Sequence, residues 1–155
     1  GISKVRREED LPSALELAFS ESPTVLVEQG VSGREFTCAA YRDAEGVKAL
    51  PVIEVVTSND YFDYDAKYNG NSQEICPAEI SEDLRDVIQK ASKDVYSFFR
   101  CSGIVRMDYI LGEDGLYFLE VNTIPGMTRA SLVPKMVRAS GQDMTDFLTA
   151  IIENS

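Results

Sequence analysis

The sequence contains no histidine among its 155 residues. This absence excludes the Ser-His-Asp and Cys-His nucleophile systems, and it excludes every zinc site that depends on a histidine ligand. Any chemistry that the chain performs must therefore rely on Asp, Glu, Asn, Lys, Arg, Tyr or backbone groups.

Cysteines and long apolar runs are also scarce. Cys38, Cys76 and Cys101 form neither a C-x-x-C pair nor a zinc-ligand spacing, so we expect buried or incidental thiols. No apolar run is long enough to cross a bilayer, and Gly1–Lys4 begins neither a signal peptide nor a transit peptide. The sequence therefore predicts a cytoplasmic protein with no membrane partner.

Basic residues are outnumbered, with 15 Lys and Arg against 26 Asp and Glu, which gives a formal net charge of -11. A surface of that charge argues against binding to a phosphate backbone, so nucleic acid is not an expected partner. The contents of 44% hydrophobic and 26% charged residues are ordinary for a globular domain. A chain of this length buries enough surface to form a core without metals or disulfides.

Residues 1–28 are predicted to form a strand, a helix and a second strand. The strands are expected at Ser3–Arg6 and Thr24–Glu28, and Asp10 or Glu9 is the expected cap of the helix, with Pro12 in its first turn. Such a piece is too small to have a core of its own. We therefore expect it to be the end of a preceding domain.

Residues 29–155 are predicted to form an α+β domain in which an antiparallel sheet is backed by helices. Phe36, Cys38 and Ala40 alternate with Glu35, Thr37 and Ala39 as in a strand, and Val47–Val56 is a strand-like run that Pro51 interrupts. The other expected elements are a loop over Thr57–Pro77, a helix that Ser81 caps and that carries an apolar stripe of Leu84, Val87, Ile88, Ala91, Val95 and Phe98, two strands over 103–112 and 115–122, and helices near 131–139 and 142–153.

The two strands around residues 113–115 carry the most informative polar residues. Arg106 and Asp108 are two positions apart, as are Glu120 and Asn122, so each pair shares one strand face. A three-residue turn with glycine last is a favoured hairpin closure, and it predicts that Asp108 lies opposite Glu120 and Arg106 opposite Asn122. A two-residue turn would put the two carboxylates on opposite faces. With the three-residue turn, the other face would hold Val105, Met107, Tyr109, Tyr117, Leu119 and Val121.

Two carboxylates and an amide oxygen on one face would form a site of hard oxygen ligands. Such a site suits magnesium, which shares its ligands with nucleotide phosphates and water. The arginine beside it would stabilise charge on a phosphoryl group. The alternative is a solvated sheet face with an Arg-Asp ion pair.

The segment after Asn122 leaves the strand through a Pro-Gly turn and leads to Ser131 at the start of a helix. Backbone N–H groups in such a turn can bind an oxyanion, and a helix N-terminus can bind a carboxylate. The alternative is a plain turn followed by a capping serine.

Seven segments, spread over nearly the full length of the chain, share one family pattern. They are Val27–Glu28, Gly33–Thr37, Leu50–Glu54, Phe62–Tyr68, Arg106–Asp108, Glu120–Thr128 and Ser131–Pro134. Taken together, these segments resemble the D-alanine–D-alanine ligase family of ATP-grasp enzymes. That resemblance implies an ATP-grasp C-terminal domain over 29–155, preceded over 1–28 by a short β-α-β remnant of the central, or lid, domain.

The resemblance also implies a role for individual residues. Asp108, Glu120 and Asn122 would hold two Mg²⁺ or Mn²⁺ ions that bridge the phosphates of ATP, while Arg106 and the Gly126 amide would stabilise the tetrahedral intermediate. The resemblance assigns the remaining residues to ligands: Glu28, the backbone near Val31 and Glu35 to adenine and ribose, Lys67 to phosphates, and Tyr68, Ser131 and the Leu132 amide to the acceptor substrate. Each of them has an ordinary alternative as a strand, loop or packing residue.

The implied reaction is the ATP-dependent ligation of two D-alanines through an acyl phosphate, for peptidoglycan precursor synthesis, in a protein that is a homodimer when complete. The donor D-alanine site would lie outside this chain, so we expect the chain alone to be inactive. Three alternatives stay open: a D-alanine–D-lactate or D-alanine–D-serine ligase, another ATP-grasp ligase, and a non-catalytic nucleotide-binding domain.

Overall fold

The structure, a computed structural model, describes residues 1–57 and 72–154. It separates into two compact units, Gly1–Val31 and Ser32–Ser155, which we describe one at a time. The domain boundary expected after residue 28, and the assignment of the first unit to a lid domain, stay predictions.

The first unit contains a 3-10 turn, η1 (Glu8–Asp10), and one helix, α1 (Leu11–Glu21). The predicted helix is confirmed, with proline in its first turn. Asp10 occupies the N-cap position, but its carboxylate accepts two hydrogen bonds from Arg7, of 3.0 and 2.9 Å, and caps nothing. The strands predicted at Ser3–Arg6 and Thr24–Glu28 are absent from this fully described unit. A strand needs a partner for its backbone ladder, and β propensity alone does not supply one.

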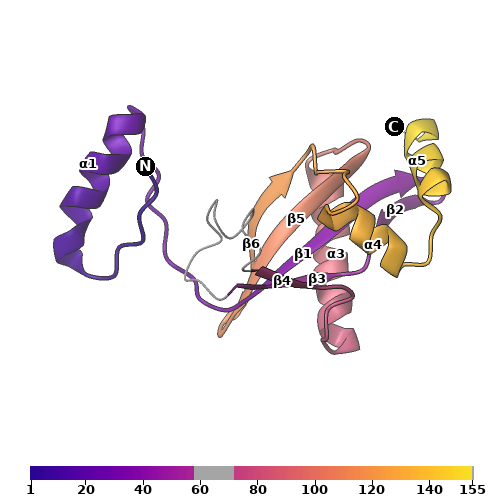
Figure 1. The fold of residues 1–155 in the computed structure, drawn as a ribbon, viewed down its shortest axis with the longest axis horizontal. Coiled ribbons are helices and arrows are strands. Elements are labelled where there is room, and N and C mark those ends of the chain that lie inside the picture. The colour runs from indigo at the N-terminus through magenta and orange to yellow at the C-terminus, as the bar shows by residue number, and fades with distance from the viewer. Residues whose placement is uncertain (58–71, 155) are drawn as a thin grey trace. The chain divides into compact units, whose positions relative to one another are not determined.

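The second unit is built on an antiparallel sheet in the order β4-β3-β1-β5-β6 (Figure 1). The long central strand β1 pairs with β3 along its first half and with β2 along its last residues. Its other edge pairs with β5 over eight residue pairs. The strands are β1 (Arg34–Asp43), β2 (Gly46–Ala49), β3 (Ile53–Thr57), β4 (Ser72–Ile75), β5 (Ile104–Gly112) and β6 (Gly115–Asn122).

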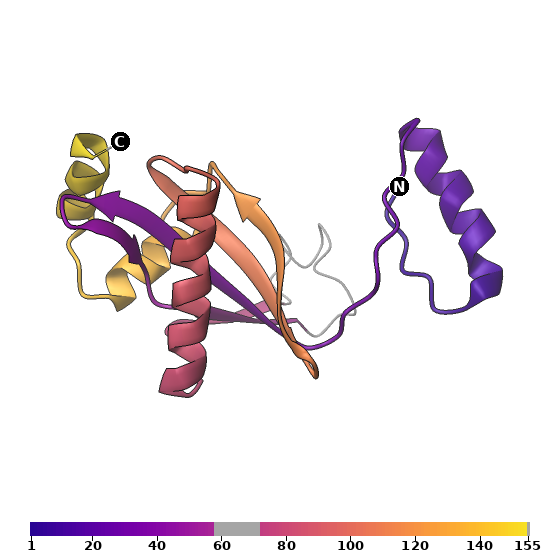
Figure 2. The same ribbon diagram turned by 180° about the vertical axis from the view of Figure 1, so that it is seen from behind.

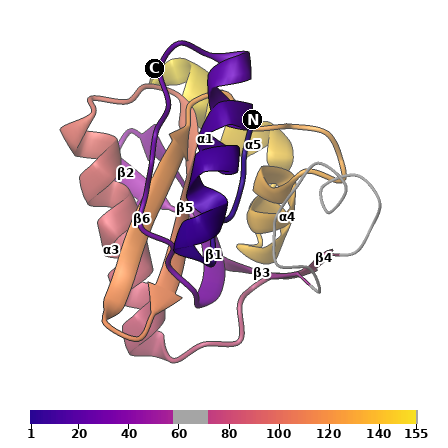
Figure 3. The same cartoon turned by 90° about the vertical axis from the view of Figure 1, so that its left-hand side faces the viewer.

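Helices cover the two faces of this sheet unequally. Helix α3 (Glu82–Phe98) packs on one face, while α4 (Leu132–Ala139) and α5 (Met144–Glu153) pack on the other (Figures 2 and 3). The α3 side buries Phe36, Cys38, Ala40, Val105, Met107 and Tyr109 of the sheet, and the α4–α5 side buries Ala39, Tyr41 and Ile53. The predicted α+β architecture, an antiparallel sheet flanked by helices, is confirmed.

The start of α3 is as predicted, because the Ser81 hydroxyl accepts a hydrogen bond of 3.3 Å from the Leu84 amide. The predicted apolar stripe is only partly right. Ile88 is fully buried, but Val87 and Phe98 are 52% and 81% exposed. The packed face of α3 also includes Ser92 and Tyr96, which the predicted stripe left out.

The region from residue 47 to residue 77 confirms one prediction and corrects another. The run Val47–Val56 is interrupted near Pro51, where β2 ends and β3 begins. The loop expected over Thr57–Pro77 instead contains β4, which pairs with β3. Strand β4 lies at the edge of the sheet and is mostly polar. Most of its residues have low β propensity, so the strand could not be predicted from composition, and only its pairing with β3 reveals it.

None of the helices in the described part of the chain has the length and apolar character that crossing a bilayer requires.

Candidate functional site

The β5–β6 hairpin brings together the four polar residues singled out in the sequence. Arg106 lies opposite Asn122, and Asp108 lies opposite Glu120, as predicted. The predicted three-residue turn is wrong, because Gly112 pairs with Gly115 and leaves a two-residue turn. The φ of Gly115 is 140°, far from the left-handed value of about 57° that the three-residue closure uses.

A β-bulge reconciles this turn with the observed pairing. Tyr109 pairs with Phe118 and Asp108 with Glu120, so Leu119 is an extra residue on β6. On the turn side of the bulge the register is shifted by one, which corrects a further prediction. Tyr117 lies opposite Ile110 and therefore on the polar face, not on the α3 side.

Strands β1, β5 and β6 form three rows of side chains on the face that α4 and α5 partly cover. Residues directly opposite one another in an antiparallel sheet share a face. The middle row contains both predicted carboxylate ligands, beside the buried Thr37. The rows are Glu35, Ile110 and Tyr117; then Thr37, Asp108 and Glu120; then Ala39, Arg106 and Asn122.

An ion pair lies at the centre of this face. The Arg106 guanidinium donates from Nε to Oδ1 of Asp108 at 2.9 Å and from Nη2 to Oδ2 at 2.8 Å. The two side chains are only 15% and 22% exposed. Nearby, burial and then the charge of Asp108 raise the pKa of the Glu35 carboxyl above its ordinary value. Negative charge is therefore concentrated here, and Arg106 pairs with part of it.

The loop after β6 is held by local hydrogen bonds. The Asn122 side-chain oxygen accepts from the Ile124 amide at 3.1 Å. Ser131 is the N-cap of α4 but makes no capping bond; instead its hydroxyl lies 2.8 Å from the Thr128 hydroxyl and accepts from the Thr128 amide at 3.1 Å. A Cβ on Gly126 would lie 2.8 Å from the Ser131 hydroxyl, so only glycine leaves that hydroxyl in place.

The α4 helix therefore begins beside this loop without a side-chain cap. Its first residue is Leu132, whose amide was predicted to bind the acceptor carboxylate. Arg138 in its last turn donates to the Arg129 carbonyl at 3.1 Å, which ties the loop back to the helix. The first turn of a helix carries amide N–H groups that lack backbone partners, and such groups bind anions.

The remaining predicted residues are placed less completely. Glu28 and Val31 belong to the first unit, and Lys67 and Tyr68 lie outside the described residues. In the described ranges no group of three or more His, Cys, Asp or Glu side chains is arranged to hold a metal. The predicted set of Asp108, Glu120 and Asn122 contains only two carboxylates, and its third ligand is an amide, so it falls outside such a group. The metal assignment stays a prediction.

Sequence reasoning did not single out Thr37, Ile110 or Tyr117 for this face. The alternation that begins at Glu35 already puts Thr37 on the same side of β1 as Glu35. Thr37 is 2% exposed, and its hydroxyl donates to the Met107 carbonyl at 3.2 Å. Nothing in the sequence shows the position of Tyr117, because that position depends on the bulge.

The opposite face of the hairpin is anchored in the core. The Tyr109 and Ser92 hydroxyls lie 2.9 Å apart, and burial raises the pKa of Tyr109 to about 12. Burial likewise raises the pKa of the Cys38 thiol to about 12, which leaves it protonated and unreactive. Cys76 and Cys101 are half-buried, and burial raises both of their pKa values.

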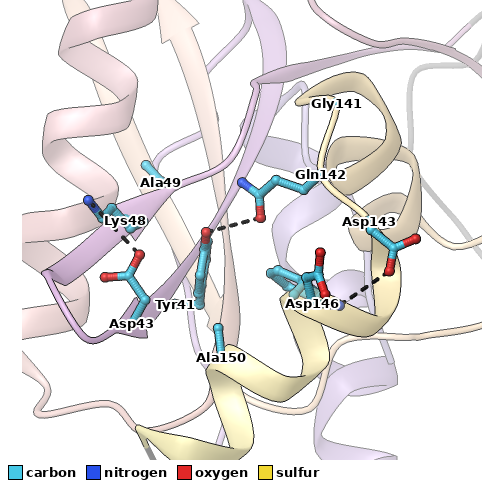
Figure 4. A pocket seen from close by; sticks show the side chains of 10 residues that line it. Tyr41, Asp43, Lys48, Ala49, Gly141, Gln142, Asp143, Asp146 and Ala150 are labelled. Carbon is cyan, nitrogen blue, oxygen red and sulfur yellow. Dashed lines mark hydrogen bonds and ion pairs between the residues drawn. The ribbon is translucent and has the colours of Figure 1, made fainter.

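A separate pocket of about 620 Å³ lies between the end of β1 and the start of α5 (Figure 4). Within it the Tyr41 hydroxyl donates to the Gln142 side chain at 3.2 Å, and Asp143 caps α5 by accepting from the Thr145 and Asp146 amides. Among the described residues that line this pocket, none was predicted for the site.

Comparisons with known proteins show which family the chain is similar to. The family model described as D-ala D-ala ligase C-terminus matches residues 1–153. A D-alanine–D-alanine ligase of Bacteroides fragilis is 47% identical over 155 residues, which is 99% of this chain and 48% of that protein. The chain thus spans about half the length of the curated relatives it matches.

Solved structures are also similar. The D-alanine–D-alanine ligase of Bacillus anthracis, complexed with ATP, superposes with a TM-score of 0.79 at 35% identity and covers 99% of this chain and 50% of that one. The VanG D-Ala:D-Ser ligase of Enterococcus faecalis superposes with a TM-score of 0.81 at 34% identity and covers 95% and 43%. Because the family model matches nearly every residue, we conclude that this chain belongs to the D-alanine–D-alanine ligase family.

Proposed function

We propose that the chain is the C-terminal catalytic part of an ATP-dependent D-alanine–D-alanine ligase that acts in the cytoplasm in peptidoglycan precursor synthesis. ATP phosphorylates the carboxylate of one D-alanine, and the amine of a second attacks the acyl phosphate to form the dipeptide. The observation that carries the proposal is the paired arrangement of Arg106 and Asp108 on β5 with Asn122 and Glu120 on β6.

The donor set of this face fits divalent cations. Asp108, Glu120 and Asn122 offer carboxylate and amide oxygens, which are the ligands that magnesium and manganese take in proteins. We propose that these residues hold two such ions. Bound there, the ions would neutralise charge on the nucleotide phosphates. Three protein ligands leave coordination positions for phosphate oxygens and water, as is usual for magnesium.

The nucleotide is proposed to be ATP, as in the solved complex from Bacillus anthracis. Glu35 is half-buried, and it shares with Asp108 the sheet face that α4 and α5 partly cover. We assign its carboxylate to the ribose. Glu28, the backbone near Val31, and Lys67 are assigned to adenine and phosphates from the family resemblance alone.

The loop after β6 is proposed to serve the second half of the reaction. Arg106 and the Gly126 amide would stabilise the oxyanion of the tetrahedral intermediate. The Ser131 hydroxyl and the Leu132 amide would bind the acceptor carboxylate, which suits a helix start with no capping bond. Tyr68 is assigned to the substrate from resemblance alone.

No protein nucleophile is required in this scheme, because the phosphoryl group leaves ATP for the substrate carboxylate itself. The protein contributes positioning and charge stabilisation, and both are within reach of Arg, Lys and backbone groups. The absence of histidine therefore agrees with the proposal.

The deciding assay measures ADP release by the complete polypeptide that carries this chain. We expect release to require both D-alanine and magnesium. ADP release that is equal with and without D-alanine would refute a ligase. The 155-residue chain alone should bind magnesium nucleotide weakly and should not turn over, and the homodimer expected of the complete protein can be checked by analytical ultracentrifugation.

A D-alanine–D-serine ligase is the second candidate, because the VanG D-Ala:D-Ser ligase is among the similar structures. D-lactate is a third acceptor to compare. Supplying D-alanine, D-serine or D-lactate as the acceptor, with D-alanine as the donor, separates these activities by their dipeptide or depsipeptide product.

A further inference from the structure

The Arg106–Asp108 ion pair engages the Nε–Nη2 edge of the guanidinium and both oxygens of the carboxylate. Each oxygen of the Asp108 carboxylate accepts one hydrogen bond, from Nε at 2.9 Å and from Nη2 at 2.8 Å. Paired, two-point contacts between a guanidinium and a carboxylate are among the strongest polar contacts in proteins, and partial burial strengthens them. In this arrangement Arg106 binds the same carboxylate that the proposed function assigns to a cation.

The same edge of the guanidinium is the one suited to phosphate. Two parallel N–H donors match two phosphate oxygens as they match two carboxylate oxygens. While Nε and Nη2 of Arg106 donate to Asp108, the same two donors cannot also bind a phosphoryl group. The contact with Asp108 and a two-point contact with a phosphoryl group therefore exclude one another on this edge.

We propose that Arg106 and the divalent cation compete for the Asp108 carboxylate, so that cation binding frees the guanidinium edge for the phosphoryl group. The inference rests on the proposed function above. Before the cation binds, Arg106 supplies the positive charge that Asp108 needs in an acidic, partly buried face. Once Asp108 is taken by the cation, the Nε–Nη2 edge is released close to where the phosphates lie.

The competition predicts that a weaker partner for Asp108 makes the cation bind more tightly. Lysine keeps the positive charge but cannot make a two-point contact. In nucleotide-free protein, Arg106→Lys should therefore lower the Kd for Mn²⁺ about tenfold, which corresponds to the loss of one charged hydrogen bond. Free Mn²⁺ is counted by electron paramagnetic resonance in a titration of the 155-residue chain.

A matched control is available on the other face of the same sheet. Arg34 makes the same two-point contact with Glu54, at 2.7 and 2.8 Å, away from the proposed cation site. Arg34→Lys should leave the Kd for Mn²⁺ unchanged. If Arg106→Lys binds Mn²⁺ no more tightly than wild type, or less tightly, then Arg106 orients Asp108 for the cation and does not compete with it.

A measurement on the unmutated chain guards against a folding defect in the variant. The Nε–Hε signal of Arg106 should be visible by NMR while the hydrogen bond to Asp108 protects it, and Arg106→Lys identifies that signal by its loss. Titration with Mg²⁺ should shift the signal and speed its exchange with water. A signal that stays unchanged while Mg²⁺ binds would overturn the competition.

Asp108→Ala separates the failure of this inference from the failure of the metal assignment. If the variant binds Mn²⁺ as wild type does, then Asp108 is not a ligand and both ideas are wrong. If Asp108→Ala loses Mn²⁺ while Arg106→Lys changes nothing, the metal site stands and only the competition fails.

Discussion

Asp108 and Glu120 lie directly opposite each other on β5 and β6, although the two-residue turn between these strands would by itself put them on opposite faces. The extra residue Leu119 accounts for the difference. It shifts the register by one position between the turn and the polar residues. The two-residue turn sets the register from Gly112 to Tyr109, and the bulge sets the register from Asp108 to Arg106. The proposed metal ligands lie in the second of these two parts of the hairpin.

Deleting Leu119 tests this account of the hairpin. Without it, Tyr109 still pairs with Phe118 and Asp108 with Glu120, now in an uninterrupted ladder. Leu119 is 51% exposed, so little core contact is lost. We expect the Mn²⁺ affinity of the chain to be retained in a direct titration.

The matched control deletes Val121, which pairs with Met107. That deletion moves Asn122 opposite Met107 and therefore to the α3 side, so Mn²⁺ affinity should fall. Equal affinity in the two deletion variants would show that the ladder register does not control the cation site.

The hairpin also shows how far the sequence alone determines the site. Residue spacing correctly put Arg106 with Asp108 and Glu120 with Asn122, because alternation along a strand is a local property. The pairing of Arg106 with Asn122 and of Asp108 with Glu120 was right, although the predicted turn and the predicted face of Tyr117 were wrong. The position of a bulge depends on how the strand ends pack, and no residue pattern in β6 predicted it.

Other differences have the same origin. Thr24–Glu28 has strand composition but no ladder, while Ser72–Ile75 has little strand composition but pairs with β3. Pairing partners decide both cases, and a single sequence does not show them. The helices near residues 81–98 and 131–153 were predictable because capping residues and apolar spacing lie within the segments themselves.

Gly33→Ala should destabilise the second unit. An added Cβ would lie 2.0 Å from the Leu111 carbonyl oxygen and 2.6 Å from its carbon, and both are backbone atoms of the hairpin. The strand must shift to admit a methyl group, at a cost of roughly 1–3 kcal/mol. Urea unfolding followed by circular dichroism measures the free energy.

The control for this substitution is Gly30→Ala, where an added Cβ meets nothing within 4 Å. It should change the free energy of unfolding by less than about 0.5 kcal/mol. If Gly33→Ala is equally harmless, the close approach of residue 33 to Leu111 is not maintained in solution.

Gly126→Ala should impair acceptor binding with little effect on stability. Its Cβ would lie 2.8 Å from the Ser131 hydroxyl, which must rotate and leave Thr128. Loss of one hydrogen bond to the acceptor should raise its KM about tenfold in the complete polypeptide. Steady-state kinetics with varied acceptor concentration measure the effect.

A double-mutant cycle identifies the cause of that loss. If the alanine acts through the Ser131 hydroxyl, then Gly126→Ala adds little once Ser131→Ala has removed it. Fully additive effects would mean that Gly126 acts on the acceptor independently of Ser131.

The Arg34–Glu54 ion pair predicts a pH-dependent stability. The hydrogen bond from Arg34 holds the pKa of the Glu54 carboxyl below its ordinary value of 4.5, against the opposing effect of burial. A carboxyl whose pKa is lower in the folded protein stabilises the fold above the unfolded pKa. That stabilisation is lost as the pH falls from about 4.5 through the folded pKa.

Arg34→Met should therefore lower the free energy of unfolding by about 2 kcal/mol at pH 7, because Glu54 is only 8% exposed and would lose its partner. The effect is not larger because Arg34 is half exposed, so solvent partly screens its charge. At pH 3.5 protonation of Glu54 makes the missing charge less important, so the difference from wild type should shrink. Adding Glu54→Gln to Arg34→Met should recover part of the stability at pH 7. Urea unfolding of the three proteins at both pH values measures this, and a difference that stays constant with pH would show that Arg34 stabilises the sheet through packing and not through the charge of Glu54.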